Sequence, residues 1–389
     1  MPQNTLQEDI QKYMAPFKSL VKRKGKGILR HDYLVPGGPY EEQWDWDAFF
    51  MGMALAAEIP SEAIFLKNWA LNYLENAENQ GFVSGCITPN GLDPRLKQIK
   101  PVLAQGCFHA SNFLNDFSWI TQHLYEKLKK IVLYREYNGY FIEKFHLGCW
   151  TDSMESGADN NPALLHYPEK SVLAVDFNVF SLLEYRAMRQ IAIALKKEGD
   201  ALLWKKKSEI LNNAILQHLW SQSDEGFFNI NLQNERFIPV VSYSSIHPFW
   251  AGIASQEQAD TFFKHYLLNE EKMLSPHGIR SLSKDDPFYN NANIIKPHSN
   301  WQGPIWPIAT YFYIISLGNY GYWDEAEKIA EKIIRICVQD IQQSGGMHEN
   351  YDAETGLPLA APNFISWNLL LINTLQQIQS RTNPFFIAP

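Results

Sequence analysis

Apolar residues recur along much of the chain with the spacing of amphipathic helices. The clearest stripe covers 322–343, where positions related by i, i+3 and i+4 are apolar. Asp324 and Glu325 fall in its first turn, where they suit the helix dipole, and Gly345 and Gly346 end it. The same pattern predicts further helices over 61–79, 108–132, 172–197, 201–220, 255–267, 306–318 and 364–380.

Long segments rich in Gly, Pro, Asn and Trp separate these helices. They cover about 30–45, 80–100, 146–170, 222–248, 272–305 and 344–363, with a short strand expected over 227–231. Loops of this length in a compact domain are usually functional or disordered, and their Trp, Asp and Asn residues favour function. Antiparallel helix pairs with such loops at one end predict an all-α toroid, with short strands at the active-site end.

Composition and charge exclude several classes of protein. No linker divides the chain, so 1–389 is predicted to be one catalytic domain, with 1–30 as an N-terminal helical lead-in. The net charge of -8 does not suit a nucleic-acid surface, and no apolar run is long enough for a membrane span or a signal peptide. Four cysteines without a CxxC spacing predict free thiols and a cytoplasmic location. Monomer and homo-oligomer both stay open.

Aromatic residues change this picture, because they make up 14% of the chain and include 12 Trp. Sugar rings have apolar C–H faces and polar rims, so Trp beside Asp, Asn and Gln suits a carbohydrate. Such clusters occur at 43–50, 155–162, 300–307, 345–352 and 364–368. Three of them have a structural alternative: Asp47 as a helix N-cap, Asp159 as a turn residue and Glu349 as a solvated loop side chain.

Asp159 and Glu349 are the candidate pair for acid–base chemistry. Glycoside hydrolysis uses one carboxyl group to protonate the leaving oxygen and a second to activate water or attack carbon. The two residues are 349 − 159 = 190 positions apart, so they can lie on opposite walls of a pocket, although spacing alone does not require it.

The ordered segments resemble glycoside hydrolase family 63 and its trehalase relatives, in particular compact bacterial mannosylglycerate and glucosylglycerate hydrolases. The matching segments are 44–50, 100–105, 156–162, 175–178, 301–306, 349–352 and 364–367. The resemblance implies an (α/α)6 barrel and an inverting mechanism, with Asp159 as a protonated general acid and Glu349 as an ionised general base. The candidate substrate-binding residues on these segments are Trp44, Trp46, Asp47, Phe50, Gln105, Asn160, Trp301, Gln302, Gly303, Trp306, Tyr351 and Trp367.

Two positions depart from the family pattern. Gln302 stands where relatives often carry an Arg that touches substrate, and Gln offers no charged, bidentate fork to a carboxylate. The change therefore weakens the expectation of an acidic substrate such as a glycosyl-glycerate. Residues 158–161 read Ala-Asp-Asn-Asn in place of the commoner Met-Asp-Asn-Ser, which leaves the acid unchanged.

The expected function is inverting hydrolysis of a small α-linked glucoside or mannoside, with a small carbohydrate as the partner and without a cofactor or metal. His146, His166 and His247 show no paired ligand spacing. A trehalase-like enzyme and an oligosaccharide-trimming α-glucosidase remain alternatives on the same fold. A sugar-binding protein that has lost catalysis and a helical-toroid isomerase with a His base are the alternatives of other classes.

Overall fold

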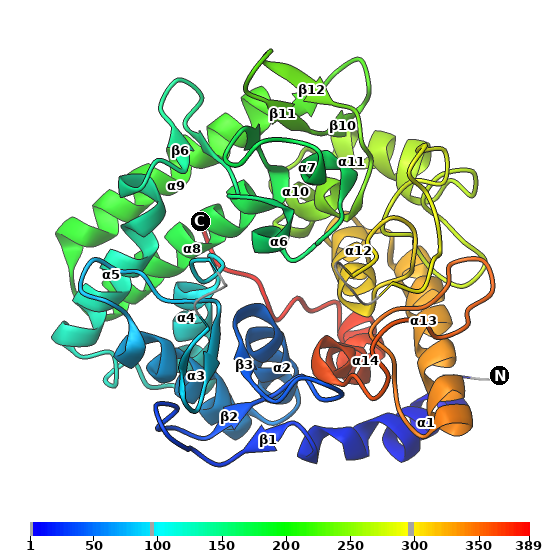
Figure 1. Ribbon diagram of the computed structural model, residues 1–389, viewed down its shortest axis with the longest axis horizontal. Helices are drawn as coiled ribbons and strands as arrows, with labels where there is room; N and C mark the ends of the chain where they lie inside the picture. The colour runs from blue at the N-terminus through cyan, green and yellow to red at the C-terminus, as the bar shows by residue number, and fades with distance from the viewer. Residues whose placement is uncertain (1–2, 94–96, 295–298) are drawn as a thin grey trace.

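The computed structural model describes residues 3–93, 97–294 and 299–389, and its helices form two concentric rings (Figure 1). Each inner helix contacts the next, and the last inner segment closes on the first. The inner ring consists of α2 (Asp45–Glu58), α4 (Leu103–Phe113), α8 (Val175–Ala194), α10 (His247–Trp250), α12 (Pro307–Asn319) and α14 (Leu371–Ser380), which follows the 3-10 helix η6 (Ser366–Leu370).

The outer ring pairs one segment with each inner helix. It consists of α1 (Gln3–Asp9) with η1 (Ile10–Met14) and η2 (Ala15–Ser19), α3 (Ala63–Asn76), α5 (Gln122–Tyr137), α9 (Glu198–His218), α11 (Gln256–Phe262) with η5 (Phe263–Leu267), and α13 (Trp323–Ser344). Shorter helical turns lie in the connections: η3 (Pro60–Glu62), α6 (Ser153–Ser156), α7 (Pro162–Leu165) and η4 (Tyr243–Ile246).

The strands are short and antiparallel, and they belong to the connections. They are β1 (Lys22–Arg23), β2 (Tyr33–Leu34), β3 (Gln43–Trp44), β4 (Cys86–Thr88), β5 (Gly91–Leu92), β6 (Phe141–Ile142), β7 (Leu147–Gly148), β8 (Val172–Leu173), β9 (Trp220–Ser221), β10 (Gly226–Phe227), β11 (Asn229–Asn231) and β12 (Arg236–Ile238). The β3–β4–β5 sheet leads directly into α2 and pairs Trp44 with Cys86. The strand expected over 227–231 is confirmed as the end of β10 and all of β11.

The periodicity of the sequence distinguishes the two rings. In α13 the buried residues follow the predicted stripe, from Ala326 through Ile333 to Val338, because only one face meets the inner ring. In α12 nearly every residue is buried, because an inner helix is covered on all sides. Gly345 ends α13 at a φ of 83°, a conformation that glycine adopts without strain.

Most predicted helices are confirmed, but the one over 108–132 is wrong. The structure ends α4 at Phe113 and begins α5 at Gln122. Asn115 has a φ of 49°, the Asp116 carboxylate accepts hydrogen bonds from Ser118, and the Thr121 hydroxyl accepts one from the Leu124 amide at the start of α5. This local turn interrupts an otherwise continuous apolar pattern.

The residues after α14 return to the middle of the ring. In Figure 1 this red segment crosses the centre of the toroid. Phe385 is 3% exposed, and its ring centroid lies 5.6 Å from that of Phe50, 5.7 Å from that of Tyr311 and 6.1 Å from that of Trp250. The tail thus fills the core at the end where the inner helices finish. No helix in the described ranges is both long and apolar enough to cross a membrane.

Candidate active site

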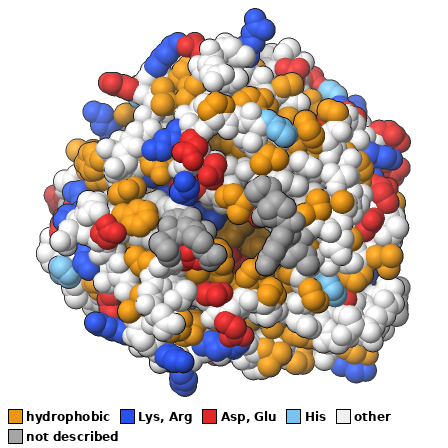
Figure 2. Space-filling model, in the orientation of Figure 1, with side chains coloured by type: hydrophobic (Ala, Val, Ile, Leu, Met, Phe, Trp, Pro, Cys, Tyr) orange, Lys and Arg blue, Asp and Glu red, His pale blue; other side chains and the backbone are white. Residues whose placement is uncertain are grey.

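The inner helices start at one end of the ring, and the segments singled out in the sequence lie at these starts. Asp47 is in the first turn of α2, Trp306 precedes α12, and Ser366 begins η6. Figure 2 shows this face hollowed near its centre, with hydrophobic side chains inside and acidic side chains at the edge. Helix starts carry partial positive charge, so carboxylates are favoured there.

Four tryptophans form one side of the site. The Trp301 and Trp306 rings stack with centroids 4.0 Å apart and planes 10° apart. The Trp46 centroid lies 6.3 Å from that of Trp301 and 5.5 Å from that of Trp367. Lys100 places Nζ 4.8 Å from the Trp46 ring centroid. The structure therefore unites tryptophans from three distant segments in one aromatic wall.

Asp47 is a buried carboxyl at the start of α2. Ser366 donates a 2.7 Å hydrogen bond to its Oδ1. Burial raises the pKa of Asp47 to about 7, against the lowering effect of this hydrogen bond. The predicted alternative of an N-cap is wrong, because α2 begins at Asp45, whose carboxylate accepts from the amides of Trp46 and Lys100.

Glu349 follows α13 and is 6% exposed. Its backbone amide donates to the Ala360 carbonyl at 3.0 Å, and its Oε2 has no hydrogen-bond partner in the part of the chain that the structure describes. Burial, together with the charges of Asp47 and Asp159, raises the pKa of Glu349 to about 8. These effects favour the protonated form of Glu349 in the ligand-free site, whereas the predicted base needs the ionised form.

Asp159 lies between the short helices α6 and α7. Ser299 donates to its Oδ2 through the backbone amide at 3.1 Å and through Oγ at 2.7 Å. Hydrogen bonds of this kind favour an ionised carboxylate. Gly157 lets this loop pack closely against Trp46. Its φ is 87°, and a Cβ there would lie 2.5 Å from Trp46 Cζ2.

Asp47, Asp159 and Glu349 act electrostatically as one set. The charges of Asp47 and Asp159 both raise the pKa of Glu349, and burial followed by all three carboxylates raises the pKa of Tyr40. Groups this strongly coupled titrate as a set. Burial and the two neighbouring carboxylates together favour a proton on Glu349.

Asn160 joins the acid loop to the tryptophan wall. Its Oδ1 accepts from the Trp301 amide at 2.6 Å, and its carbonyl accepts from Gln302 Nε2 at 2.9 Å. Gln302 Oε1 in turn accepts from Asn290 Nδ2 at 3.1 Å. Gly303 is needed for packing, since a Cβ would lie 2.2 Å from the Asn290 carbonyl oxygen. The structure thus shows these residues aligning the loop, while their contacts with sugar stay a prediction.

A buried network lies behind Glu349. Asp340 Oδ2 is 2.8 Å from His348 Nδ1 and accepts from the Tyr351 hydroxyl at 3.0 Å. Ser344 donates to Asp340 Oδ1 at 2.9 Å. These contacts anchor both sides of Glu349 to the end of α13.

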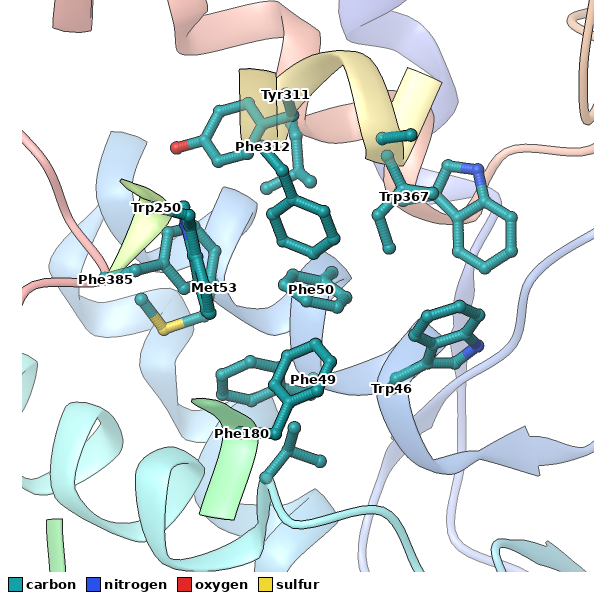
Figure 3. Packing of buried hydrophobic residues seen from close by; sticks show 14 of the residues in the cluster. Trp46, Phe49, Phe50, Met53, Phe180, Trp250, Tyr311, Phe312, Trp367 and Phe385 are labelled. Atoms are coloured by element: carbon teal, nitrogen blue, oxygen red, sulfur yellow. The ribbon is translucent and has the colours of Figure 1, made fainter. Parts of the chain in front are cut away.

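Two predicted substrate contacts are corrected by this geometry. Tyr351 directs its hydroxyl at Asp340, so it supports the loop and does not face the hollow. Phe50 is fully buried one turn below Trp46 on α2, in ring contact with Phe49 and Phe312 (Figure 3). Residues i and i+4 share a helix face, so Phe50 continues the face of Trp46 one turn further into the core.

Gln105 and Trp44 have contacts within the protein that do not involve the three carboxyls. The Gln105 amide donates to the carbonyls of Pro101 at 2.6 Å and Phe180 at 3.2 Å, so both of its hydrogens already serve the fold. A sugar contact through this nitrogen would require one of these bonds to break. Trp44 is half-buried in ring contact with Tyr40, with centroids 6.0 Å apart.

Sequence reasoning missed Tyr40, Ser299, Ser366 and Asp340. Ser366 and Ser299 lie in or beside matched segments, so their neighbours were the available signal. Tyr40 and Asp340 had none, because an isolated Tyr or a helical Asp is common in any chain. Within the described ranges, no three His, Cys, Asp or Glu residues are grouped as metal ligands.

Residues 119–367 match the family described as the mannosylglycerate hydrolase MGH1-like glycoside hydrolase domain. A mannosylglycerate hydrolase from Rubrobacter radiotolerans is 22% identical over 50% of this chain and 42% of its own length. A probable mannosyl-oligosaccharide glucosidase from Schizosaccharomyces pombe is 24% identical over 58% of this chain and 29% of its own length. The chain thus spans less than half the length of these relatives.

Solved structures confirm the fold. A GH63 mannosylglycerate hydrolase from Thermus thermophilus, in complex with Tris and D-glycerate, superposes with a TM-score of 0.70. The match covers 95% of this chain and 100% of that one at 17% identity. The predicted (α/α)6 architecture is therefore correct.

Proposed function

Because the chain belongs to the mannosylglycerate hydrolase MGH1-like glycoside hydrolase family, we propose that it hydrolyses a small α-linked glucoside or mannoside with inversion at the anomeric carbon. The observation that carries this proposal is the set of three coupled carboxyls beside the tryptophan wall. Asp159 and Glu349 reach it from separate loops, as a reaction with attack and departure on opposite faces of a sugar requires.

Asp159 is the general acid in this proposal. It transfers its proton to the glycosidic oxygen as the bond from that oxygen to the anomeric carbon breaks. Glu349 accepts a proton from a water whose oxygen bonds to the same carbon from the other face. The products are the free sugar and the aglycone, which leaves with the proton of Asp159 on its oxygen. Asp159 ends ionised and Glu349 ends protonated.

The resting site must therefore redistribute one proton. Burial and neighbouring charge favour the proton on Glu349, whereas catalysis needs it on Asp159. A single proton serves the pair in either position. The basic limb of kcat/KM should thus report a value near 8, because the shared proton is lost above it.

The remaining groups bind and orient the sugar in this proposal. Trp46 and Trp367 offer ring faces to the sugar and exclude water. Asp47, held by Ser366, binds sugar hydroxyls. Gln302 is neutral and already bonded to Asn160 and Asn290, which supports an uncharged aglycone. A cytoplasmic location belongs to the same proposal and is consistent with the four buried free thiols.

A proton NMR time course with a panel of small α-glucosides, α-mannosides, trehalose and α-linked oligosaccharides tests the proposal. Wild type should release the β-anomer first, and Asp159→Asn and Glu349→Gln should each lose activity by about 100- to 10,000-fold. Early release of the α-anomer would refute inversion. Cleavage of trehalose or oligosaccharides alone would replace the substrate class, and binding without cleavage of any substrate would favour a sugar-binding protein.

A further inference from the structure

A second pocket lies at the other end of the inner ring, and we name it the tail pocket. Its volume is about 520 Å³, and it is lined by residues near the ends of α2, α4, α8 and α14 and by Thr382, Asn383, Pro384, Phe386 and Ala388. Asp45 begins α2 at the active-site end, whereas Ala57 near the end of α2 lines the tail pocket. Twelve residues of α-helix separate the two, which corresponds to about 18 Å.

Neutral polar groups and aromatic rings line the tail pocket. Six lining residues carry carboxamides: Asn112, Gln190, Asn373, Gln376, Gln377 and Asn383. Phe108, Phe113 and Phe386 add apolar ring surface. Among the described residues that line this pocket, none is Asp, Glu, Lys or Arg. An ionic ligand would therefore find no counter-charge among these lining side chains.

Two of these carboxamides are each fixed by a hydrogen bond through one of their two polar atoms. Tyr311 donates to Gln377 Oε1 at 2.9 Å, and Asn373 Nδ2 donates to the Ala54 carbonyl at 2.9 Å. Their other atoms, Gln377 Nε2 and Asn373 Oδ1, remain for a ligand. A fixed carboxamide presents donor and acceptor groups, as a hydroxyl-rich molecule requires.

His109 is a buried, neutral residue in the wall of the tail pocket. It lines the tail pocket and is 2% exposed, and its Nε2 has no hydrogen-bond partner in the described chain. Burial lowers the pKa of His109 to about 3, so the ring is neutral. A buried polar atom without a partner is uncommon in folded proteins. A ligand in the pocket would contact this ring, so the His109 signal reports on occupancy.

We propose that the tail pocket binds a neutral, hydroxyl-rich molecule of monosaccharide size, such as a free sugar or polyol. Its volume lies within the range of small-molecule sites, of about 300–1,000 Å³. Carboxamides bind the hydroxyls, and the Phe rings cover the C–H face. This site is separate from the hydrolytic site and does not depend on the proposed hydrolysis.

NMR titration of protein labelled with ¹³C at the histidine rings tests the tail pocket directly. The probes are D-glucose and glycerol, with D-glycerate and D-glucosamine as charged controls, and His109→Gln assigns the His109 signal. D-Glucose or glycerol should shift this signal saturably in wild type and equally in Asp159→Asn. A crystal structure with D-glucose provides a second readout if His109→Gln does not fold.

Variants at the rim complete the test. Gln376→Trp should fill the pocket and abolish the response, whereas Gln343→Trp, at an exposed site on α13, should retain it. Asn112→Ala should weaken binding about three- to tenfold through loss of one hydrogen bond. A His109 signal that ignores both neutral probes, together with an empty pocket in the crystal, would overturn the site. Tighter binding of either charged control would overturn the ligand class.

Discussion

Replacing Glu349 by Gln should stabilise the fold while it removes activity. The pKa of Glu349 rises from 4.5 to about 8 in the folded protein. Each tenfold change in a proton equilibrium corresponds to about 1.4 kcal/mol, so the ionised carboxylate costs the folded state up to about 5 kcal/mol. The charges of Asp47 and Asp159 contribute to this shift, so this figure is an upper bound.

The cost depends on pH in a defined direction. Below pH 4.5 the carboxyl is protonated in the folded and unfolded states, and the cost is absent. Between pH 4.5 and about 8 only the unfolded state ionises, so the free energy of unfolding falls as pH rises. Above about pH 8 both states are ionised, and the full cost applies.

Urea denaturation of wild type and Glu349→Gln measures this effect. The variant should gain up to about 5 kcal/mol at about pH 9 and little at about pH 5. Glu271→Gln, at an exposed position, is the matched control and should change neither value. An equal gain at both pH values, or a loss at the higher one, would refute the view that burial and like charge destabilise this carboxylate.

Three further predictions concern the support of the site and the core. Ser366→Ala removes the 2.7 Å hydrogen bond that lowers the pKa of Asp47, so this pKa should rise above about 7. Carboxyl ¹³C NMR measures it, and an unchanged value would contradict the contact. Asp340→Asn weakens the network behind the catalytic loop, so kcat should fall about tenfold or more with a smaller change in KM, and wild-type kcat would argue against a positioning role. Phe385→Ala should cost about 3–5 kcal/mol in urea denaturation, whereas Phe386→Ala, at a side chain that is 64% exposed, should cost far less. Equal losses in the two would show that the buried ring does not fill the core.

The architecture could be predicted from periodicity because most helices carry one apolar stripe. Periodicity gave the wrong result over 108–132, because the apolar spacing continues through a turn that depends on Asp116 and Thr121. Such short-range side-chain contacts leave no periodic signal. The pairing of helices into two closed rings likewise came from family resemblance, because nothing in one amphipathic stripe identifies its partner.

The site could be predicted only in part. Matched segments contained Asp159, Glu349 and Trp46, but a segment does not say which of its residues faces the hollow. Phe50 and Tyr351 shared those segments and turned out to support the core and the loop. The protonation of Glu349 was not accessible at all, since it depends on burial and on charges from two distant parts of the chain.

The hydrogen bond between Asp47 and Ser366 joins residues 319 positions apart. During synthesis from the N-terminus, the ribosome must therefore add these 319 residues before this contact can form. Joining such remote segments has an entropic cost that local helix formation does not share. The nascent chain can accumulate helical hairpins without a functioning pocket, and sugar recognition should appear only when the last hairpin docks against the first.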